Sequence, residues 1–249
     1  FVQGIGEHWT GSFHLVLTSK IKMDILIIPV TTIIQIVNES KGFFNSYPLT
    51  PPVAVPVSMR GGDRPHKYET EPRKGECVMS DKKIKSMVMA AVMAALTYVA
   101  TTVIKIPAPT GGYVHIGDGL VLLCGWILGP WWGGAAAGIG SMLVDLLGGY
   151  MSFVPGTLII KFLDAMAAAL IVKALGRKTY SYVVGGLAGE AIMVAGYFVY
   201  EALALQLGMG AAAGVLANVG QGAVGLVIAL VLMALLKGSK ALDKLAVQW

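Results

Sequence analysis

Several polar side chains that could bind a small ligand stand within the apolar second half of the sequence. Lys161 and Asp164 lie three residues apart, a spacing that puts both on one face of a helix. Asn218 and Gln221 have the same spacing. Carboxyl, ammonium and amide groups donate and accept the hydrogen bonds that orient a solute in a pocket. These positions are therefore candidates for substrate binding.

A second set of polar residues follows one stripe of a helix. Glu190, Tyr197 and Glu201 are spaced i, i+7 and i+11, which keeps them on one side of a helix. We expect Tyr197 and Glu201 to line a ligand pocket together with the two amides, because amides and phenols rarely face lipid without a reason.

The charges near Lys161 have two interpretations. In the first, Lys161 pairs with Asp145 or Asp164 and only neutralises the interior of a helix bundle. In the second, these three residues contact the ligand. All three are kept as candidate binding residues.

Two polar joints between apolar stretches carry aromatic side chains. One joint, residues 107–118, combines stiff prolines with permissive glycines, and the other is residues 148–155. Their candidate binding residues are Tyr113, His115, Asp118 and Tyr150, and the second joint also carries the aromatic ring of Phe153. Flexible lids with aromatic rings over a polar hollow suit the capture of a small planar solute. For His115, an ordinary histidine at the lipid boundary is the alternative.

The rest of the composition argues against a metal site, a catalytic centre and nucleic acid binding. His115 is the only histidine after residue 66, which makes a histidine-based cluster in the apolar part implausible. Cys77 and Cys124 have neither the spacing of a metal site nor the number needed for a disulfide framework. The net charge of +5 comes from basic residues at the ends of apolar segments rather than from one patch. We therefore expect no metal, no cofactor, no nucleic acid partner and no enzymatic activity.

The elements that must position these residues are long apolar segments. Hydrophobic residues make up 55% of the sequence and charged residues 13%, whereas about a quarter of a soluble domain is charged. The segments are residues 84–106, 117–129, 131–147, 157–175, 182–205 and 211–236. They predict an all-α membrane protein, a bundle of six transmembrane helices. The second and third segments are short, and a re-entrant hairpin is the competing interpretation for them.

Basic residues alternate between the two sides of this predicted bundle. One side receives nine cations, namely Lys82, Lys83, Lys85, Lys173, Arg177, Lys178, Lys237, Lys240 and Lys244. The other side receives Lys105 and Lys161. Since cytoplasmic loops carry the excess of Lys and Arg, the N and C termini are predicted to be cytoplasmic. In that topology the polar residues named above, apart from Glu190, gather in the outer half of the bundle.

Residues 1–78 differ from the rest of the chain. They contain prolines without a period, a charged stretch at residues 61–76, and an apolar run at residues 23–37 that is too short to cross a bilayer. Met79 is followed by Ser-Asp-Lys-Lys, which looks like a bacterial start. We expect residues 1–78 to be a non-native or disordered upstream extension, and residues 79–249 to form the membrane domain.

Small residues recur at the four-residue spacing of close helix contacts. In the first apolar segment these are Ala90, Ala91, Ala94 and Ala95. Lipid gives helices little hydrophobic reason to associate, so small side chains that let backbones approach supply dispersion contacts instead. Internal packing and the docking of a partner protein are both open for this stripe.

Several local sequences of the membrane part match one family of membrane proteins. They are the Ala-rich first segment, the stretch Ile-Pro-Ala-Pro-Thr-Gly-Gly-Tyr-Val-His-Ile-Gly-Asp at residues 106–118, Leu-Gly-Pro-Trp-Trp-Gly at residues 128–133, residues 138–150, and the segment of Lys161 and Asp164. In these features the chain resembles the substrate-binding S components of energy-coupling factor (ECF) transporters, the vitamin-uptake systems of bacteria. Within that family it looks most like the branch for hydroxymethylpyrimidine, pyridoxine or riboflavin.

The resemblance implies a function and a set of partners. It implies capture of a water-soluble vitamin or vitamin precursor from outside, at an outward-facing site covered by the loops after helices one, three and five. It also implies docking, through Ala90, Ala91, Ala94 and Ala95, on an energising module of one transmembrane coupling subunit and two ATPases. The location implied is the bacterial cytoplasmic membrane, with several passes. A stand-alone secondary transporter or channel is the alternative function.

Overall fold

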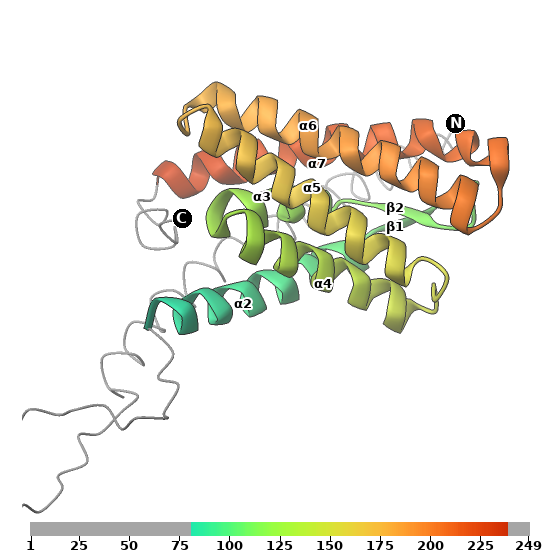
Figure 1. Cartoon of the computed structure of the whole chain (residues 1–249), viewed down its shortest axis with the longest axis horizontal. Coiled ribbons are helices and arrows are strands. Elements are labelled where there is room, and N and C mark those ends of the chain that lie inside the picture. The colour runs from blue at the N-terminus through green and yellow to red at the C-terminus, as the bar shows by residue number, and fades with distance from the viewer. Residues whose placement is uncertain (1–80, 239–249) are drawn as a thin grey trace, which may run out of the picture. The chain divides into compact units, whose positions relative to one another are not determined.

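The apolar sequence from residue 81 onward folds into six α-helices and one short pair of strands, and the computed structural model describes residues 81–238 (Figure 1). The helices are α2 (Asp81–Val103), α3 (Asp118–Leu128), α4 (Pro130–Gly148), α5 (Val154–Ala174), α6 (Thr179–Val199) and α7 (Ala212–Gly238). The predicted helical segments are thus found in the predicted order. The expectations for residues 1–78 lie outside the described residues.

Length and composition separate the helices into two groups. Within residues 81–238, four helical stretches are long and apolar enough to cross a membrane: Lys83–Val103, Val154–Ala174, Thr179–Ala204 and Gly208–Gly238. By contrast, α3 has 11 residues, all of them buried, and at 1.5 Å per residue it is about 16 Å long. The hydrocarbon core of a bilayer is about 30 Å thick. The chain is therefore a helical membrane protein, and six full spans stay a prediction for the α3–α4 pair.

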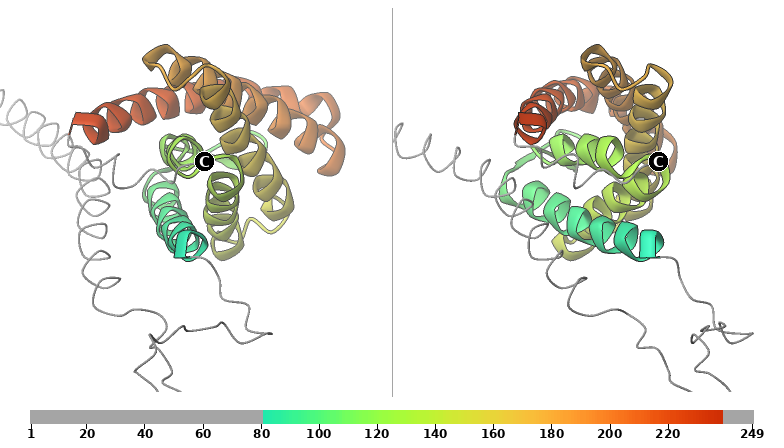
Figure 2. Two further views of the ribbon diagram at one scale, coloured as in Figure 1. Left: turned by 60° about the vertical axis from the view of Figure 1, so that its left-hand side comes forward. Right: turned by 90° about the vertical axis from the view of Figure 1, so that its left-hand side faces the viewer.

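The short helix α3 occupies the middle of the bundle. It packs against α2, α4, α5, α6 and α7. In Figures 1 and 2, α2 and α4 lie on one side of α3, and α6 and α7 lie on the other. Polar residues on α3 are therefore surrounded by protein rather than lipid.

A tight turn joins α3 to α4. Gly129 has φ +86°, a left-handed backbone that glycine adopts at no steric cost, and Pro130 occupies the first turn of α4. A Cβ at Gly133 would lie 2.3 Å from the carbonyl oxygen of Cys124, so a larger residue could not be accommodated there. The absence of side chains at this point lets the two helix backbones touch.

The connections between helices are divided between two ends of the bundle. One end carries the α4–α5 and α6–α7 connections together with strands β1 (Lys105–Pro107) and β2 (Tyr113–His115), whereas the start of α2 and the end of α7 lie at the other end (Figure 1). The strands are antiparallel, with Ile106 opposite Val114. The joint predicted as a flexible lid is thus a β-hairpin, because its strands satisfy their backbone groups by pairing.

Candidate substrate-binding site

The hairpin brings aromatic and basic side chains over one end of the bundle. The rings of Tyr113 and Tyr150 lie 4.7 Å apart between centroids and are tilted by 55°. The Lys105 ammonium lies 4.7 Å from the centroid of the Tyr113 ring, within the range of a cation–π contact. These contacts hold the hairpin against the α4–α5 connection, so that the two predicted lids form one roof.

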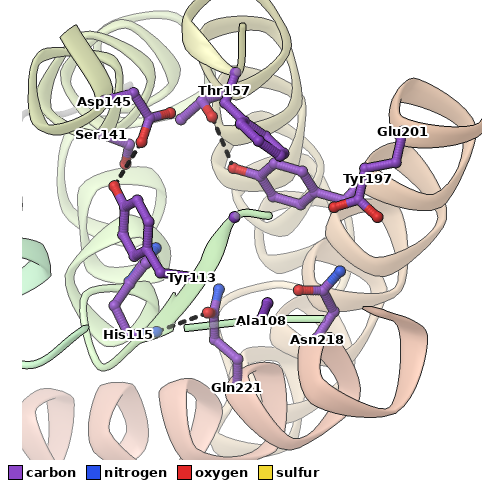
Figure 3. Close-up of a pocket in the computed structure, with 12 residues that line it drawn as sticks. Ala108, Tyr113, His115, Ser141, Asp145, Thr157, Tyr197, Glu201, Asn218 and Gln221 are labelled. Carbon is purple, nitrogen blue, oxygen red and sulfur yellow. Dashed lines mark hydrogen bonds between the residues drawn. The ribbon is translucent and has the colours of Figure 1, made fainter. Parts of the chain in front are cut away.

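A narrow pocket lies beneath this roof (Figure 3). It is lined by Ala108, Gly112, Tyr113, His115, Ser141, Asp145, Phe153, Thr157, Tyr197, Glu201, Asn218 and Gln221. The empty space between these side chains, counted out to the open solvent, is about 450 Å³. The cavity that these side chains enclose is only about 30 Å³, room for one or two water molecules. A bicyclic or tricyclic ligand would therefore enter only if the roof moved.

One wall of the pocket is built around Asp145 at the end of α4. The Tyr113 hydroxyl donates a hydrogen bond of 2.5 Å to the Asp145 carboxylate. Burial, the hydrogen bond to Asp145 and the charge of that carboxylate raise the pKa of Tyr113, so its hydroxyl stays protonated. Next to this pair, the hydroxyls of Thr157 and Tyr197 lie 3.0 Å apart (Figure 3). This wall offers hydroxyl groups and a carboxylate to a ligand.

The opposite wall contains Glu201 and Asn218. Glu201 lies in a π-helical turn, Tyr200–Ala204, that continues α6, and such turns are frequent at functional sites. One of its carboxylate oxygens accepts a hydrogen bond of 3.0 Å from the Thr110 hydroxyl, and the other has no partner. Asn218 of α7 points toward the same space (Figure 3).

His115 and Gln221 form the floor. The His115 backbone N–H donates to the Gln221 side-chain oxygen at 2.8 Å, and the Gln221 amide donates to Asp118 at 2.7 Å. The His115 ring accepts a hydrogen bond of 3.1 Å from the Gly117 N–H, and burial lowers the pKa of His115 to about 4. His115 is therefore neutral near pH 7. It is also buried, so the interpretation as an ordinary histidine at the lipid boundary is wrong.

Behind this floor lies a charge cluster, which we define as Asp118, Lys161, Asp164 and Glu190. Lys161 forms a hydrogen-bonded ion pair with Asp118 and lies 3.8 Å from an Asp164 oxygen, and all three side chains are fully buried. Glu190 lies close enough to this group to interact with the charges of its three members. The Lys161 ammonium lies 5.7 Å from the centroid of the Tyr197 ring, so the cluster is directly behind the pocket wall.

The charge cluster corrects the expectations for Asp118 and for Asp145. Asp118 is the first residue of α3 and is fully buried, rather than part of a lid. Of the two predicted partners of Lys161, Asp164 is an ion-pair partner, whereas Asp145 lies under the hairpin and accepts from Tyr113 instead. Glu190, which is predicted to be the deepest residue of its stripe, also interacts with the charges of this cluster.

The structure divides the predicted binding residues into two groups. Those that line the pocket are Tyr113, His115, Asp145, Tyr197, Glu201, Asn218 and Gln221. Those that do not are Asp118, Lys161 and Asp164, which form the charge cluster, and Tyr150, which supports the Tyr113 ring from outside. In residues 81–238, no group of His, Cys, Asp and Glu is arranged to hold a metal ion.

Phe153, an aromatic residue of the second predicted lid, lines the pocket. Four further lining residues were not predicted, namely Ala108, Gly112, Ser141 and Thr157. Two of them carried a usable signal. Ser141 precedes Asp145 by four residues, and Thr157 precedes Lys161 by four, so each shares a helix face with a recognised polar residue. No comparable pattern marks Ala108 or Gly112, which reach the pocket through the geometry of the hairpin.

The alanine stripe of α2 is split between two environments. Ala90 is buried, and a Cβ at Gly140 of α4 would lie 2.5 Å from the Ala94 carbonyl oxygen. Ala91 and Ala95 are exposed, on a face that also exposes Val88. Internal packing therefore accounts for Ala90 and Ala94, whereas Ala91 and Ala95 are accessible to another protein.

Comparisons with known proteins point to one family. Residues 81–238 match a family model described as "ECF-type riboflavin transporter, S component". A protein of Pyrococcus woesei, described as "Uncharacterized protein in gap 3'region", is 36% identical over 101 residues. That match covers 40% of this chain and 66% of the length of the relative.

A solved structure is also similar in part. It is described as "Structure and mechanism of the S component of a bacterial ECF transporter" and has 20% sequence identity and a TM-score of 0.45. The match covers 64% of this chain and 97% of that chain.

Proposed function

The chain belongs to the family of S components of ECF-type riboflavin transporters, and we propose that it captures a water-soluble vitamin or vitamin precursor in the pocket beneath the hairpin. The family is one of substrate-binding transport subunits rather than of enzymes. The resemblance seen in the sequence is thereby confirmed at the level of the family, and the substrate, the binding residues and the docking surface are proposals.

The observation that carries this proposal is a polar pocket built inside an apolar bundle. Buried polar side chains are costly in a membrane protein and mark substrate pathways and binding sites. Here they come from the hairpin, α4, α5, the end of α6 and α7, and they converge on one space (Figure 3). A purely structural role would not need hydroxyl, amide and carboxyl groups from five segments around a common cavity.

The distribution of basic residues supports an outward-facing pocket. Lys83 and Lys85 lie near the start of α2, Lys173 lies near the end of α5, and Lys237 lies near the end of α7. These positions are at the end of the bundle opposite the hairpin (Figure 1). Because cytoplasmic ends carry the Lys and Arg excess, we place both termini in the cytoplasm and the pocket toward the outside of a bacterial cytoplasmic membrane.

The proposed substrates are hydroxymethylpyrimidine, pyridoxine and riboflavin. Each is an aromatic ring system with hydroxyl or amine groups, and the pocket offers aromatic rings together with hydrogen-bonding groups. Riboflavin is the substrate named by the family model.

Delivery of the substrate requires a second surface. We assign docking on the ATPase-driven module to the exposed alanines of α2, Ala91 and Ala95, rather than to all four alanines of the stripe. Small side chains there would let a partner helix approach the α2 backbone. We also propose that residues 79–249 form the membrane domain and that residues 1–78 are an upstream extension outside it.

The binding proposal is tested with the purified full chain and a panel of water-soluble vitamins, by native mass spectrometry. We expect one of the three proposed substrates to bind, and substitution of Asn218 by Leu to weaken that binding. Saturable binding that is unaffected by changes at Asn218, Gln221 and Glu201 would place the site elsewhere.

The docking proposal is tested with the double variant Ala91→Leu, Ala95→Leu. We expect it to lose uptake in cells that contain the energising module while keeping substrate binding in detergent. The control is Val227→Phe on the exposed face of α7, which should keep both activities. Loss of binding and uptake together, or uptake by wild type without the module, would contradict the proposal.

A further inference from the structure

The pocket is lined by acidic side chains but by none that is positively charged near pH 7. Its lining includes the carboxylates of Asp145 and Glu201, and within residues 81–238 no lysine or arginine lines it. His115 adds no charge near pH 7, because its pKa is about 4. The lining itself is therefore electrically neutral or negative.

Of the two acids that line the pocket, Glu201 is the one with a buried oxygen that has no hydrogen-bond partner. Its side chain is only 3% exposed, one oxygen accepts from Thr110, and the other oxygen has no partner. A buried carboxylate oxygen without a donor costs free energy unless a ligand supplies one. The carboxylate points into the pocket from the side of α6, facing the Asn218 amide (Figure 3).

The nearby cations are occupied elsewhere. Lys161 lies behind the wall and pairs with Asp118 and Asp164. Lys105 sits over the Tyr113 ring, whose hydroxyl donates to Asp145 at the other wall of the pocket. Among the side chains that the structure describes, neither ion pair involves Glu201. The charge of this carboxylate is therefore left for the ligand to balance.

We propose that the pocket selects a neutral or cationic ligand that donates an N–H or O–H group to Glu201, and that it rejects carboxylate or phosphate derivatives of the same ring. This inference rests on the proposed function of the pocket as the vitamin site. A positively charged or donor-bearing group satisfies the unpaired oxygen and strengthens the contact through charge. An anion would be held next to Glu201 and Asp145 with no cation in the lining, and like charges that are brought together in a dry site cost several kcal/mol.

The test compares three pairs of compounds that differ in charge on one ring system. They are riboflavin and flavin mononucleotide, pyridoxamine and 4-pyridoxic acid, and 4-amino-5-hydroxymethyl-2-methylpyrimidine and its monophosphate. Dissociation constants are measured by calorimetry with the full chain in detergent at pH 7.5. In every pair that binds, we expect the non-anionic member to bind at least about 100-fold more tightly.

Variants locate the selectivity at one residue. Selectivity is expressed as the dissociation constant of the anionic member of a pair divided by that of the non-anionic member. Glu201→Gln keeps the size of the side chain but removes the charge, and should reduce this ratio by about 10-fold or more. Thr110→Val removes the one donor to Glu201 and should increase the ratio a few-fold. Glu190→Gln is the matched control, because it changes an acid of the same helix that does not line this pocket, and should leave the ratio unchanged.

The outcomes separate this inference from the proposed function. Equal or tighter binding of the anionic member, or an unchanged ratio in both Glu201→Gln and Thr110→Val, would overturn charge selection while leaving a vitamin site. Absence of binding for all six compounds and for pyridoxine would reject the proposed function, and charge selection with it.

Discussion

The pocket and the charge cluster behind it are made from the same residue types but treat them differently. In the pocket, Asp145 and Glu201 accept hydrogen bonds from the neutral hydroxyls of Tyr113 and Thr110. In the cluster, Asp118 is paired with a lysine and lies fully buried. In a buried ion pair, each charge is balanced by the partner. A hydroxyl that donates a hydrogen bond leaves the carboxylate charged and able to accept from another donor. The hydrogen-bonding partners of the acidic residues therefore divide them into a structural group and a proposed ligand-binding group.

Gln221 joins the two regions. Its oxygen accepts from the His115 backbone beside the pocket, and its amide donates to Asp118 in the cluster. A ligand that displaces the Gln221 side chain would therefore break hydrogen bonds both in the pocket and in the charge cluster.

Substitution of Lys161, the cation of the charge cluster, should cause the largest loss of stability. Lys161→Met leaves Asp118 and Asp164 buried without a cation, and we expect a loss of about 3–5 kcal/mol in the free energy of unfolding. Thermal and denaturant unfolding in detergent measure it. The double variant Lys161→Met, Asp118→Asn should recover part of the stability, and a single variant as stable as wild type would show that the cluster is not structural.

Acidification should destabilise the pocket through His115. Its pKa of about 4 in the folded state lies below the usual value of 6.5, so the unfolded state gains a proton first as pH falls. Stability should therefore be intact above pH 6.5 and decrease by up to about 3 kcal/mol as the pH falls toward 4.

The contribution of His115 is isolated by comparing the wild type with His115→Asn, whose side-chain oxygen can still accept from Gly117. The variant should show a shallower pH dependence of unfolding between pH 6.5 and 4. Parallel curves for the two proteins would assign the effect to other groups.

Variants of the two amide residues, Asn218 and Gln221, should distinguish an effect on ligand binding from an effect on stability. Asn218→Leu and Gln221→Leu should each weaken ligand binding by about 1–3 kcal/mol, because each removes hydrogen-bonding groups from the pocket. Only Gln221→Leu should also reduce the free energy of unfolding, since only Gln221 bonds to Asp118. Calorimetric titration measures the binding free energy, and thermal unfolding measures the stability. Equal stabilities of the two variants would show that the hydrogen bond between Gln221 and Asp118 does not stabilise the fold.

The smallest effect is expected at the roof. Tyr113→Phe removes the hydrogen bond to Asp145 but keeps the ring against Tyr150, and should weaken binding by about 1 kcal/mol. Tyr150→Phe, which keeps its ring contact with Tyr113 and does not line the pocket, is the control and should bind as wild type does. A larger loss in the control would mean that the roof acts through Tyr150.

Local periodicity predicted much of the site. Tyr197 and Glu201 are four residues apart, and Asn218 and Gln221 three apart, so each pair had to share a helix face wherever the helix was placed. Both pairs line the pocket. The hairpin was missed because its strands are only three residues long and their pairing depends on backbone register rather than on a hydrophobic pattern.

Hydropathy and helical periodicity act over a few residues, and they were enough to predict a helical membrane protein, the order of its helices and the polar residues that share a helix face. The pairing of charges could not be predicted in this way. Lys161 and Asp118 are 43 residues apart, and Gln221 and Asp118 are 103 apart. Such pairings depend on the depth and rotation of each helix, and these are set by packing of the whole bundle, including the close approach of α3 and α4 at Gly133.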